Sequence, residues 1–404
     1  MRKIDLANFQ VATSETARHI NRRIVLNLIR SHQPISRADL ARHSGLQRST
    51  ISVIIEQLVR EKWVTEGASG HTPRGRRPRF LHMNKERAGI IGIDLRPAAT
   101  TFGLANLDAH FLAQESLPTG DDPARFIAEL SARLRRLIRA HPKISCEGIG
   151  VSLPGRIDVA SQKLVFAPNL GWSDVDLKTP LEKATGLPVE LENAANACAL
   201  AEVWFGRYTE GVHNLIAVTV SEGIGSGLIL NGQIVRGPTG AAGEFGHVTI
   251  VEDGLECRCG NHGCWEVYAS NPAAVRYYEQ AASRQRNGKA GGRETESALT
   301  FDDVMRLAGQ GAPKAVEALR RMAHYLGAGI ALLITGLAPD VIIIVGDLTR
   351  AWKEIGPVID ETIRSRCPTH ARTRVIPTDP VAQPRLRGTI ALVLQKHFGA
   401  PLVA

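Results

Sequence analysis

The sequence predicts an α/β protein in which a small helical domain precedes a body of two lobes. Strand-like and helix-like segments alternate in two rounds after Gly89, and such alternation is typical of α/β folds. Before Gly89, apolar residues recur at helical spacing, and a loop rich in glycine, proline and arginine follows them. The chain has 404 residues, which is enough for two or three domains of ordinary size. Hydrophobic residues make up 44% of the chain and charged residues 22%, which excludes a disordered or fibrous protein.

Three helices are expected in the N-terminal domain. Ser36 is a favoured N-cap and predicts the start of the second helix. Ser44, Gly45 and Leu46 predict a turn, after which a third helix should run over residues 47–61. This is the pattern of a helix-turn-helix. Its recognition helix, here the third helix of the domain, enters the major groove of DNA. The residues expected on the buried faces are Ile20, Ile24, Leu28 and Ile29 in the first helix, Leu40 and Ala41 in the second, and Ile51, Ile55, Leu58 and Val59 in the third.

Two strands around an arginine-rich loop should complete this domain as a wing. Residues 63–65 and 80–82 have the pattern of strands, and the loop between them contains the run PRGRRPR. A loop of glycine, proline and arginine can follow the phosphate backbone and enter a narrow minor groove. The alternative is a three-helix bundle used for protein contacts, which leaves the arginines unexplained. The residues expected to contact DNA are Arg37, Gln47, Arg48, Ser49, Thr50, Arg74, Arg76 and Arg77.

The positive charge of the chain is confined to this domain. Residues 1–87 contain 17 Lys and Arg against 7 Asp and Glu, a net charge of +10, whereas residues 88–404 carry a net charge of −1. A compact basic segment joined to a neutral body indicates a nucleic-acid partner, here double-stranded DNA, although charge alone leaves a merely solubilising face open. The apolar runs fall far short of the ~20 residues that span a membrane, and the start MRKIDLANFQ has no apolar signal-peptide core. We therefore expect a cytoplasmic protein without a membrane partner.

The body should contain two rounds of strands and helices. Asn231 and Gly232 predict a hairpin in the second round, and the polar residues 283–297 predict a surface insertion. Strands are expected over residues 89–95, 100–108, 148–155, 188–193, 215–220 and 341–346, and helices over residues 123–139, 195–205, 313–336 and 388–398.

Three of the six cysteines lie within eight residues, and a histidine lies ten residues before the first of them. In a reducing compartment such a cluster indicates a metal site more than a disulfide. One imidazole and three thiolates are a complete ligand set for structural zinc. We predict one zinc ion per chain, bound by His247, Cys257, Cys259 and Cys264. Two alternatives stay open: His262 as the fourth ligand, and no metal at all.

GEFGH at residues 243–247 and CRCGNHGCWE at residues 257–266 together resemble the signature of the ROK family, which comprises repressors, open reading frames and sugar kinases. The resemblance extends from about Gly89 to the C-terminus. With the N-terminal domain included, the chain resembles the transcription-factor branch, which contains the xylose and N-acetylglucosamine repressors. The resemblance implies a body of the sugar-kinase and actin-like ATPase type. Further motifs in the family's order are Ser152 to Gly155 with Asp158, residues 168–172, Glu192 and Asn193 with Asn196, residues 223–225, and Gly237 with Gly240.

The resemblance also implies a sugar site between the two lobes. The positions that match the family's sugar-binding residues are Asn169, Asn193, Glu244, His247 and Glu266. Carboxylates, amides and an imidazole are the groups that several hydroxyls of one sugar require. His247 would bind zinc through one ring nitrogen and the sugar through the other, so that the metal orients the ring. Outside this motif, a carboxylate such as that of Glu244 would be expected to be a solvated loop side chain without a binding role.

The positions that family kinases use for phosphate transfer have changed. Ala194 replaces the aspartate that takes the proton from the sugar hydroxyl, and a methyl group cannot act as a base. Residues 94–98, DLRPA, replace the first phosphate loop, so glycines are lost and a proline without an N–H is gained. In the second loop, Glu222 would put negative charge beside the phosphates. Asp347 and Leu348 replace the glycines expected near the nucleotide base.

Together these observations predict a sugar-responsive DNA-binding regulator, a repressor, that is not an enzyme. Its effector would be a sugar or a sugar phosphate, and it would act as a homodimer or homotetramer. The alternatives are an active ROK sugar kinase with a DNA-binding domain, and a regulator whose body binds a protein. The expected domains are residues 1–87 for DNA binding, residues 88–193 with 385–404 as the smaller lobe, and residues 194–384 as the larger lobe with the zinc motif and the oligomerisation surface.

Overall fold

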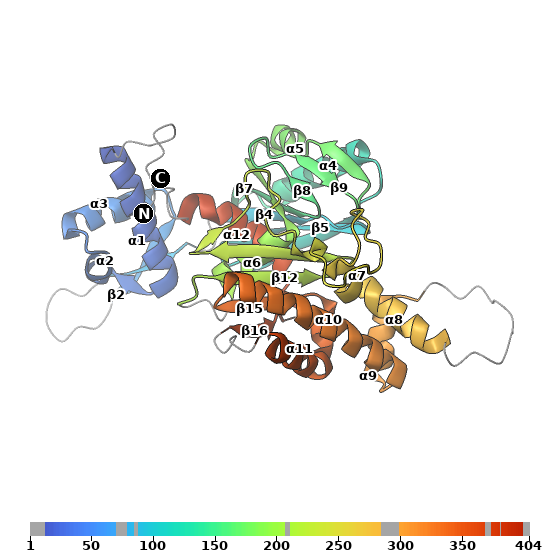
Figure 1. Ribbon diagram of the computed structural model, residues 1–404. Coiled ribbons are helices and arrows are strands. Elements are labelled where there is room, and N and C mark those ends of the chain that lie inside the picture. The colour runs from blue at the N-terminus through green and yellow to red at the C-terminus, as the bar shows by residue number, and fades with distance from the viewer. Residues whose placement is uncertain are drawn as a thin grey trace.

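The computed structural model describes residues 13–69, 79–84, 88–206, 211–283, 299–367, 373–379 and 381–398. The described chain forms a small N-terminal domain and a body with two five-stranded sheets (Figure 1). This confirms the predicted fold class, a winged helix-turn-helix followed by a two-sheet α/β body. Arg74, Arg76 and Arg77 of the predicted wing loop, and residues 284–297 of the predicted insertion, lie outside the described residues.

The N-terminal domain contains the predicted helix-turn-helix. The Ser36 hydroxyl accepts a hydrogen bond from the Asp39 N–H, and the Asp39 side chain accepts one from the Ser36 N–H, so the second helix begins with a capping box. Gly45 has a φ of 71°, a left-handed conformation that ends this helix and makes the turn. A three-stranded sheet with the order β1-β3-β2 completes the domain. Its elements are α1 (Ser14–His32), β1 (Ile35–Ser36), α2 (Arg37–Ser44), α3 (Arg48–Arg60), β2 (Val64–Ser69) and β3 (Arg79–Met83).

The buried faces of α1 and α3 differ from those predicted. In α1, Val25 and Leu26 are buried, whereas Ile24 is 40% exposed. In α3, Ile54 is buried in place of Val59, which is 36% exposed. Apolar residues cover more than one side of α1, so their spacing allows two faces. The contacts of α1 with α2, with α3 and with the C-terminal helix of the body favour the face of Val25.

The first sheet of the body has the strand order β11-β7-β4-β5-β6. β4 is parallel to β7, which is parallel to β11, and β5 and β6 continue the sheet in antiparallel pairs. β6 was not predicted because one of its faces is exposed and it lacks a continuous apolar run. The elements of this part are β4 (Ala88–Asp94), β5 (Ala99–Asn106), β6 (Phe111–Pro118), α4 (Pro123–Ala140), β7 (Ser145–Leu153), β8 (Arg156–Ile157), β9 (Leu164–Ala167), β10 (Trp172–Val175), α5 (Lys178–Thr185) and β11 (Val189–Asn193).

The second sheet has the strand order β14-β13-β12-β15-β16. Asn231 and Gly232 both have positive φ angles, 52° and 72°, and form the predicted hairpin between β13 and β14. Apolar residues of α10 and α11 pack in one core cluster with β12 and β15. The elements are β12 (Leu215–Val220), β13 (Ile224–Leu230), β14 (Gln233–Ile234), η1 (Phe245–His247), α7 (Trp265–Ala269), α8 (Asn271–Ser283), α9 (Phe301–Gly309), α10 (Pro313–Leu337), β15 (Val341–Val345), η2 (Asp347–Ala351), α11 (Trp352–Arg366) and β16 (Arg374–Pro377).

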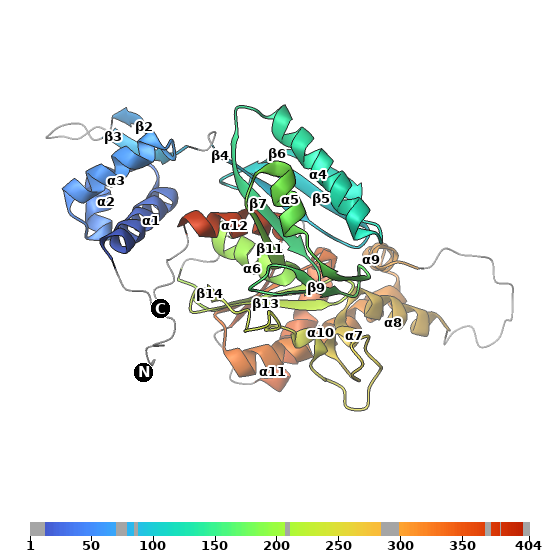
Figure 2. The same cartoon turned by 90° about the horizontal axis from the view of Figure 1, so that it is seen from above.

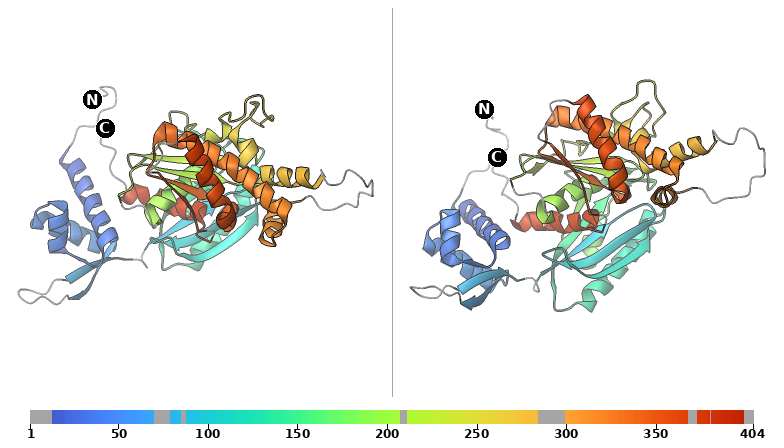
Figure 3. Two further views of the ribbon diagram at one scale, coloured as in Figure 1. Left: turned by 60° about the horizontal axis from the view of Figure 1, so that its bottom comes forward. Right: turned by 90° about the horizontal axis from the view of Figure 1, so that it is seen from below.

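Two helices, α6 (Ala194–Phe205) and α12 (Pro384–Phe398), lie between the two sheets and pack against each other (Figure 2). α6 contacts β12 and β13, and α12 contacts β4 and β7. The two helices approach closely: a Cβ atom at Gly388 would lie 1.9 Å from the carbonyl oxygen of Ala197. α12 also contacts α1, so that the N-terminal domain lies beside the end of the C-terminal helix (Figure 3). Among the described helices, none combines the length and low polarity that a membrane crossing needs.

Candidate metal centre and effector site

The predicted metal ligands lie on the segment from η1 to the start of α7. The Cys257 N–H donates to the Asn261 carbonyl, and the Gly260 N–H donates to the Cys257 carbonyl, which closes a tight turn. Gly260 has a φ of 89°, which glycine adopts without strain. A Cβ atom at Gly263 would lie 1.8 Å from the Val251 carbonyl oxygen. Both glycines of the motif therefore permit the compact loop that the sequence predicts.

Four side chains of this loop meet at one point. The ligand atoms of His247, Cys257, Cys259 and Cys264 all lie within 4.8 Å of one another. Cys257 Sγ is 3.6 Å from His247 Nδ1, and Cys259 Sγ is 3.7 Å from Cys264 Sγ. A tetrahedral zinc ion with zinc–sulfur bonds of about 2.3 Å would separate its sulfur ligands by about 3.8 Å. The cluster can therefore hold a metal ion, and His262 is not among its members.

The thiols of the cluster shift one another's pKa values in different directions. Burial, followed by the thiols of Cys259 and Cys257, raises the pKa of Cys264 to about 12. Burial also raises the pKa of Cys257. At Cys259, the effect of burial is outweighed by the Asn261 N–H and the neighbouring thiols, and the pKa is lowered. A divalent cation would supply the positive charge that three adjacent thiolates need.

Glu266 contacts both the metal loop, which is the segment from His247 to Cys264, and residues 221–227, which correspond to the second phosphate loop of family kinases. Its Oε2 accepts a hydrogen bond of 3.0 Å from the Ile224 N–H, and the Cys257 Sγ lies 3.9 Å from its Oε1. A Cβ atom at Gly223 would lie 2.1 Å from Glu266 Oε2. Glycine at position 223 is therefore required for this carboxylate to reach the backbone.

Glu244 and Asn169 also lie beside the metal loop. Glu244 Oε2 is 3.8 Å from His247 Nε2, so the two ring nitrogens of His247 have different neighbours: Nδ1 is near Cys257 and Nε2 is near Glu244. Arg258, between two of the metal ligands, donates to Asn169 Oδ1 at 3.5 Å. The sequence did not indicate this contact, because Asn169 and Arg258 belong to different parts of the body.

Asn193 lies where β11 ends and α6 begins. It caps α6, since its Oδ1 accepts from the Ala195 N–H at 2.8 Å, and its Nδ2 donates to the Gly155 carbonyl at 2.9 Å. The neighbouring Glu192 is buried and accepts from the Asn193 N–H and from Arg236 Nε at 2.8 Å. Arg236 follows β14, so this ion pair links the two halves of the body. A buried glutamate at a strand end signals the need for a counterion, but its sequence position could not identify Arg236.

The turn after β4, where family kinases have their first phosphate loop, contains an ion cluster. The Asp94 side chain is 4% exposed and lies between two guanidinium groups: Arg96 Nε is 2.7 Å from Oδ2, and Arg385 Nε is 2.8 Å from Oδ1. Arg385 also donates to the Leu95 carbonyl at 3.1 Å. Burial disfavours the charged form of Arg96, but Asp94 outweighs burial and raises the pKa of Arg96. The negative charge of Asp94 is thus neutralised by the chain itself.

The other altered kinase positions differ in exposure. Ala194 begins α6 beside Asn193. Glu222 and Asp347 are exposed, whereas Leu348 is fully buried in the core between the second sheet and its outer helices. A leucine side chain therefore occupies space that a glycine would leave empty.

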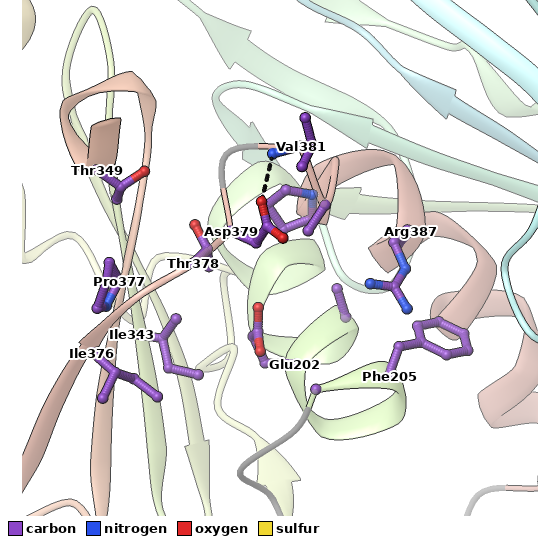
Figure 4. Close-up of a pocket in the computed structure, with 14 residues that line it drawn as sticks. Glu202, Phe205, Ile343, Thr349, Ile376, Pro377, Thr378, Asp379, Val381 and Arg387 are labelled. Carbon is purple, nitrogen blue, oxygen red and sulfur yellow. Dashed lines mark hydrogen bonds between the residues drawn. The ribbon is translucent and has the colours of Figure 1, made fainter. Parts of the chain in front are cut away.

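A cavity of about 530 Å³ lies between α6, the ends of β15 and β16 and the start of α12. Figure 4 shows Glu202 of α6 and Arg387 of α12 among its lining residues. Burial raises the pKa of Glu202, opposed by Arg387, and burial lowers the pKa of Arg387, opposed by Glu202. None of the five residues predicted to bind the sugar lines this cavity.

Most of the described residues predicted to contact DNA lie at the N-terminal end of α3. Gln47, Arg48 and Ser49 are exposed, and Thr50 is half-buried. α1 and α2 begin with capping boxes, but Gln47 makes no side-chain hydrogen bond at the start of α3. The first N–H groups of α3 thus lack a side-chain cap, and a phosphate group can supply their acceptors.

Arg37 has a contact within the domain. Its guanidinium is 2.6 Å from Glu66 of β2, and Arg79 is 3.0 Å from the other oxygen of the same carboxylate. The hydrogen bond from Arg79, helped by Arg37, lowers the pKa of Glu66 despite burial. Arg37 therefore links the start of α2 to β2 through an ion pair.

Comparisons with known proteins agree with this architecture. Residues 18–65 match the model of a winged helix-turn-helix DNA-binding domain. The xylose repressor of Bacillus subtilis (strain 168) is 32% identical over 358 residues, which are 88% of this chain and 88% of that protein. A solved structure of a ROK family transcriptional regulator, a homologue of the E. coli Mlc protein, has a TM-score of 0.81 and 27% identity, and it covers 95% of this chain and 98% of its own.

The body also resembles kinases. A ROK family glucokinase from Streptomyces griseus, solved in complex with glucose and AMPPNP, has a TM-score of 0.67 and 30% identity and covers 76% of this chain and 100% of its own. The ROK family model matches residues 90–396. The regulators among these relatives match the N-terminal domain as well as the body, whereas the glucokinase match is confined to about three quarters of the chain. The protein thus belongs to the ROK family, as a transcriptional regulator with an N-terminal winged helix-turn-helix.

Proposed function

We propose that this regulator is a repressor whose body binds a sugar effector without phosphorylating it. The observation that carries the proposal is the contrast between two groups of residues. Asn169, Glu244, His247 and Glu266 gather around one loop and offer acceptors and donors suited to sugar hydroxyls. The turn after β4, by contrast, has its Asp94 paired with two arginines.

The metal of the loop would be zinc, with one ion per chain. A set of one imidazole and three thiolates is characteristic of closed structural zinc sites. The spacing of the ligand atoms fits a tetrahedral ion of that size. The ion would hold the loop that presents Glu244 and Glu266, and it would leave His247 Nε2 for the sugar.

Chemistry on the sugar would need a base and a seat for nucleotide phosphates. Ala194 supplies no base. Arg96 and Arg385 already engage the carboxylate of Asp94, so this group is not available to a magnesium ion bound to a nucleotide. The body would therefore bind the effector and release it unchanged.

The helix α6 extends from the proposed effector site toward the DNA-binding domain. Asn193 caps the start of α6, and the helix reaches Trp204 in its last turn, about 17 Å away along the axis. There the Arg30 guanidinium of α1 lies 4.6 Å from the centre of the Trp204 ring, and Phe398 of α12 packs edge-on at 6.0 Å. Phe398 also packs against Trp63 at the base of the wing. A movement of Asn193 on sugar binding would shift this aromatic contact and so the orientation of the DNA-binding domain.

The proposed domain division is the one that the sequence predicts. We propose residues 1–87 as the DNA-binding domain, residues 88–193 with 385–404 as the smaller lobe, and residues 194–384 as the larger lobe. The protein would act as a homodimer or homotetramer on a palindromic operator, because two-fold symmetric proteins bind two equivalent half-sites. It would act in the cytoplasm, where it can reach chromosomal DNA.

Two measurements test the effector. A thermal-shift panel of neutral, N-acetylated and phosphorylated sugars identifies the ligand, and D-xylose belongs in it because one relative is a xylose repressor. Operator binding is then titrated with and without the sugar that raises the unfolding temperature. We expect that sugar to weaken operator binding. If no sugar shifts the unfolding temperature and a cellular protein binds the body instead, the sugar proposal is wrong.

The wing arginines test the DNA contact. Arg76→Ala with Arg77→Ala should weaken binding to all duplexes and reduce the slope of log affinity against log salt by about 2, because phosphate contacts release counterions. A matched control is Arg135→Ala with Arg139→Ala, which removes the same charge from exposed positions on α4. Equal losses in both double variants would show that only the net charge matters.

A further inference from the structure

One apolar side chain lies on the exposed face of α3. The buried face of this helix consists of Ile51, Ile54, Ile55 and Leu58. Val53, on the other side, is 65% exposed, the largest exposed fraction among the large hydrophobic residues of the described N-terminal domain.

The neighbours of Val53 are the polar residues that face DNA in a helix-turn-helix. Ser49 lies four residues before it and Glu56 three residues after it, so both share its side of the helix. Arg48 and Ser49 are exposed at the end that enters the groove first. A valine in this place gains nothing from water and has lower helix propensity than alanine. Its position on this surface therefore favours an apolar contact made only in the complex with DNA.

The major groove offers one apolar feature among the base edges, the C5-methyl group of thymine. We propose that Val53 packs against a thymine methyl group and so specifies an A·T pair in each operator half-site. Arg48, Ser49 and Ser52 supply hydrogen-bond donors and acceptors around it, whereas Val53 makes a contact that depends on the methyl group alone. The inference rests on the conclusion that this chain binds DNA and extends it to the choice of base.

The experiment replaces thymine by uracil, which removes only the methyl group. The full-length protein first selects its preferred sequence from a randomised duplex library. Each thymine of one selected half-site is then changed singly to uracil, and binding is measured by fluorescence anisotropy for the wild type and for Val53→Ala. We expect one uracil to weaken wild-type binding about fourfold, as the loss of one buried methyl contact implies, and the same uracil to leave Val53→Ala unaffected.

Val59→Ala is the matched control. Val59 is partly exposed on the same helix but lies six residues, or about 9 Å along the axis, farther from the end that enters the groove. This variant should keep the full uracil penalty. Thermal unfolding of both variants should stay close to that of the wild type, because Val53 is mostly exposed and Val59 is partly exposed.

Three outcomes decide between the inferences. A wild type that tolerates uracil at every position overturns the methyl contact, and so does a penalty that persists unchanged in Val53→Ala. If the wild type enriches no sequence from the library, sequence-specific DNA binding itself is wrong, and that result is distinct from a failure of Val53.

Discussion

The metal loop and the turn after β4 lie in one body, yet they balance their charges in opposite ways. In the metal loop, three thiols and an imidazole converge without a cationic side chain among them, and the pKa of Cys264 rises to about 12. In the turn after β4, the buried Asp94 has two guanidinium groups within 3 Å. A bound cation would favour the ionised thiolates of the first site, whereas in the second site two arginines already balance the charge of Asp94.

This difference indicates which partners the body can take. A cluster of three thiols and an imidazole whose ligand atoms lie within 4.8 Å of one another can hold a metal ion. An aspartate paired with two arginines has little to gain from a magnesium nucleotide. Under the proposed function, the body would bind a sugar beside the metal loop and would have lost phosphate transfer at the turn after β4.

The largest effect is expected when two of the predicted metal ligands are removed. Cys257→Ser with Cys259→Ser should reduce zinc from one ion per chain to nearly none and lower the unfolding temperature, because metal binding at a structural site contributes directly to folding. Metal analysis and thermal unfolding measure both effects.

The matched control is Cys146→Ser, since Cys146 is a cysteine outside the cluster. It should retain one zinc ion per chain. A full complement of zinc in the double variant would reject the predicted ligand set.

The next effect separates the metal from the sugar. The Glu266→Ala variant should retain zinc and DNA binding. Its affinity for the sugar should fall by about 10- to 100-fold, because a charged hydrogen-bond partner is lost. Isothermal titration with the identified sugar, and operator binding in its presence, measure the change. Glu252→Gln, an exposed residue of the same loop, should behave as the wild type. A Glu266→Ala variant that still releases DNA at the wild-type sugar concentration would place the effector elsewhere.

A smaller effect is expected at Trp204, which forms one of the contacts between the body and the N-terminal domain. Trp204→Leu removes the ring that Arg30 and Phe398 contact. The affinity for the sugar alone and the affinity for DNA alone should change little. The factor by which saturating sugar weakens operator binding should fall by about tenfold, a change within the 1 to 3 kcal/mol typical of allosteric coupling. The measurement is operator affinity with and without saturating sugar. An unchanged ratio would show that the coupling does not pass through α6.

The last substitution is expected to have no effect on phosphorylation activity. Ala194→Asp restores the missing base but leaves Arg96 and Arg385 on Asp94, so ATP-dependent phosphorylation of glucose or xylose should remain undetectable. A coupled assay with an active ROK glucokinase as positive control sets the detection limit. Turnover by the wild type or by this variant that disappears after Asp94→Asn would contradict the comparison.

Much of the local structure could be predicted because its causes lie within a few residues. Ser36 caps α2, Gly45 makes the turn, and Asn231 with Gly232 forms the hairpin, since each conformation depends on the residue itself and its neighbours. The cysteine spacing likewise predicted a cluster that the fold brings together. β6 was missed because an edge strand with one exposed face has no distinctive apolar pattern.

The candidate site was predicted in part. The resemblance to the ROK family implied that Glu266 and His247 belong to one site, because the two motifs that contain them form the family's signature. It could not indicate that Arg258 reaches Asn169 or that Arg236 pairs with Glu192, because such contacts depend on how the two halves of the body meet.

By itself, the sequence determined the periodicities, caps, turns and ligand types, and through them the two kinds of domain and the metal motif. The tertiary structure alone decided which face of α1 is buried, which aromatic rings meet at Trp204, and which cations neutralise Asp94. Arg385 contacts Leu95 across 290 residues of chain. Such a pairing has no local signal, because any of the arginines could satisfy a buried carboxylate and only the packing of α12 against β4 selects the one that does.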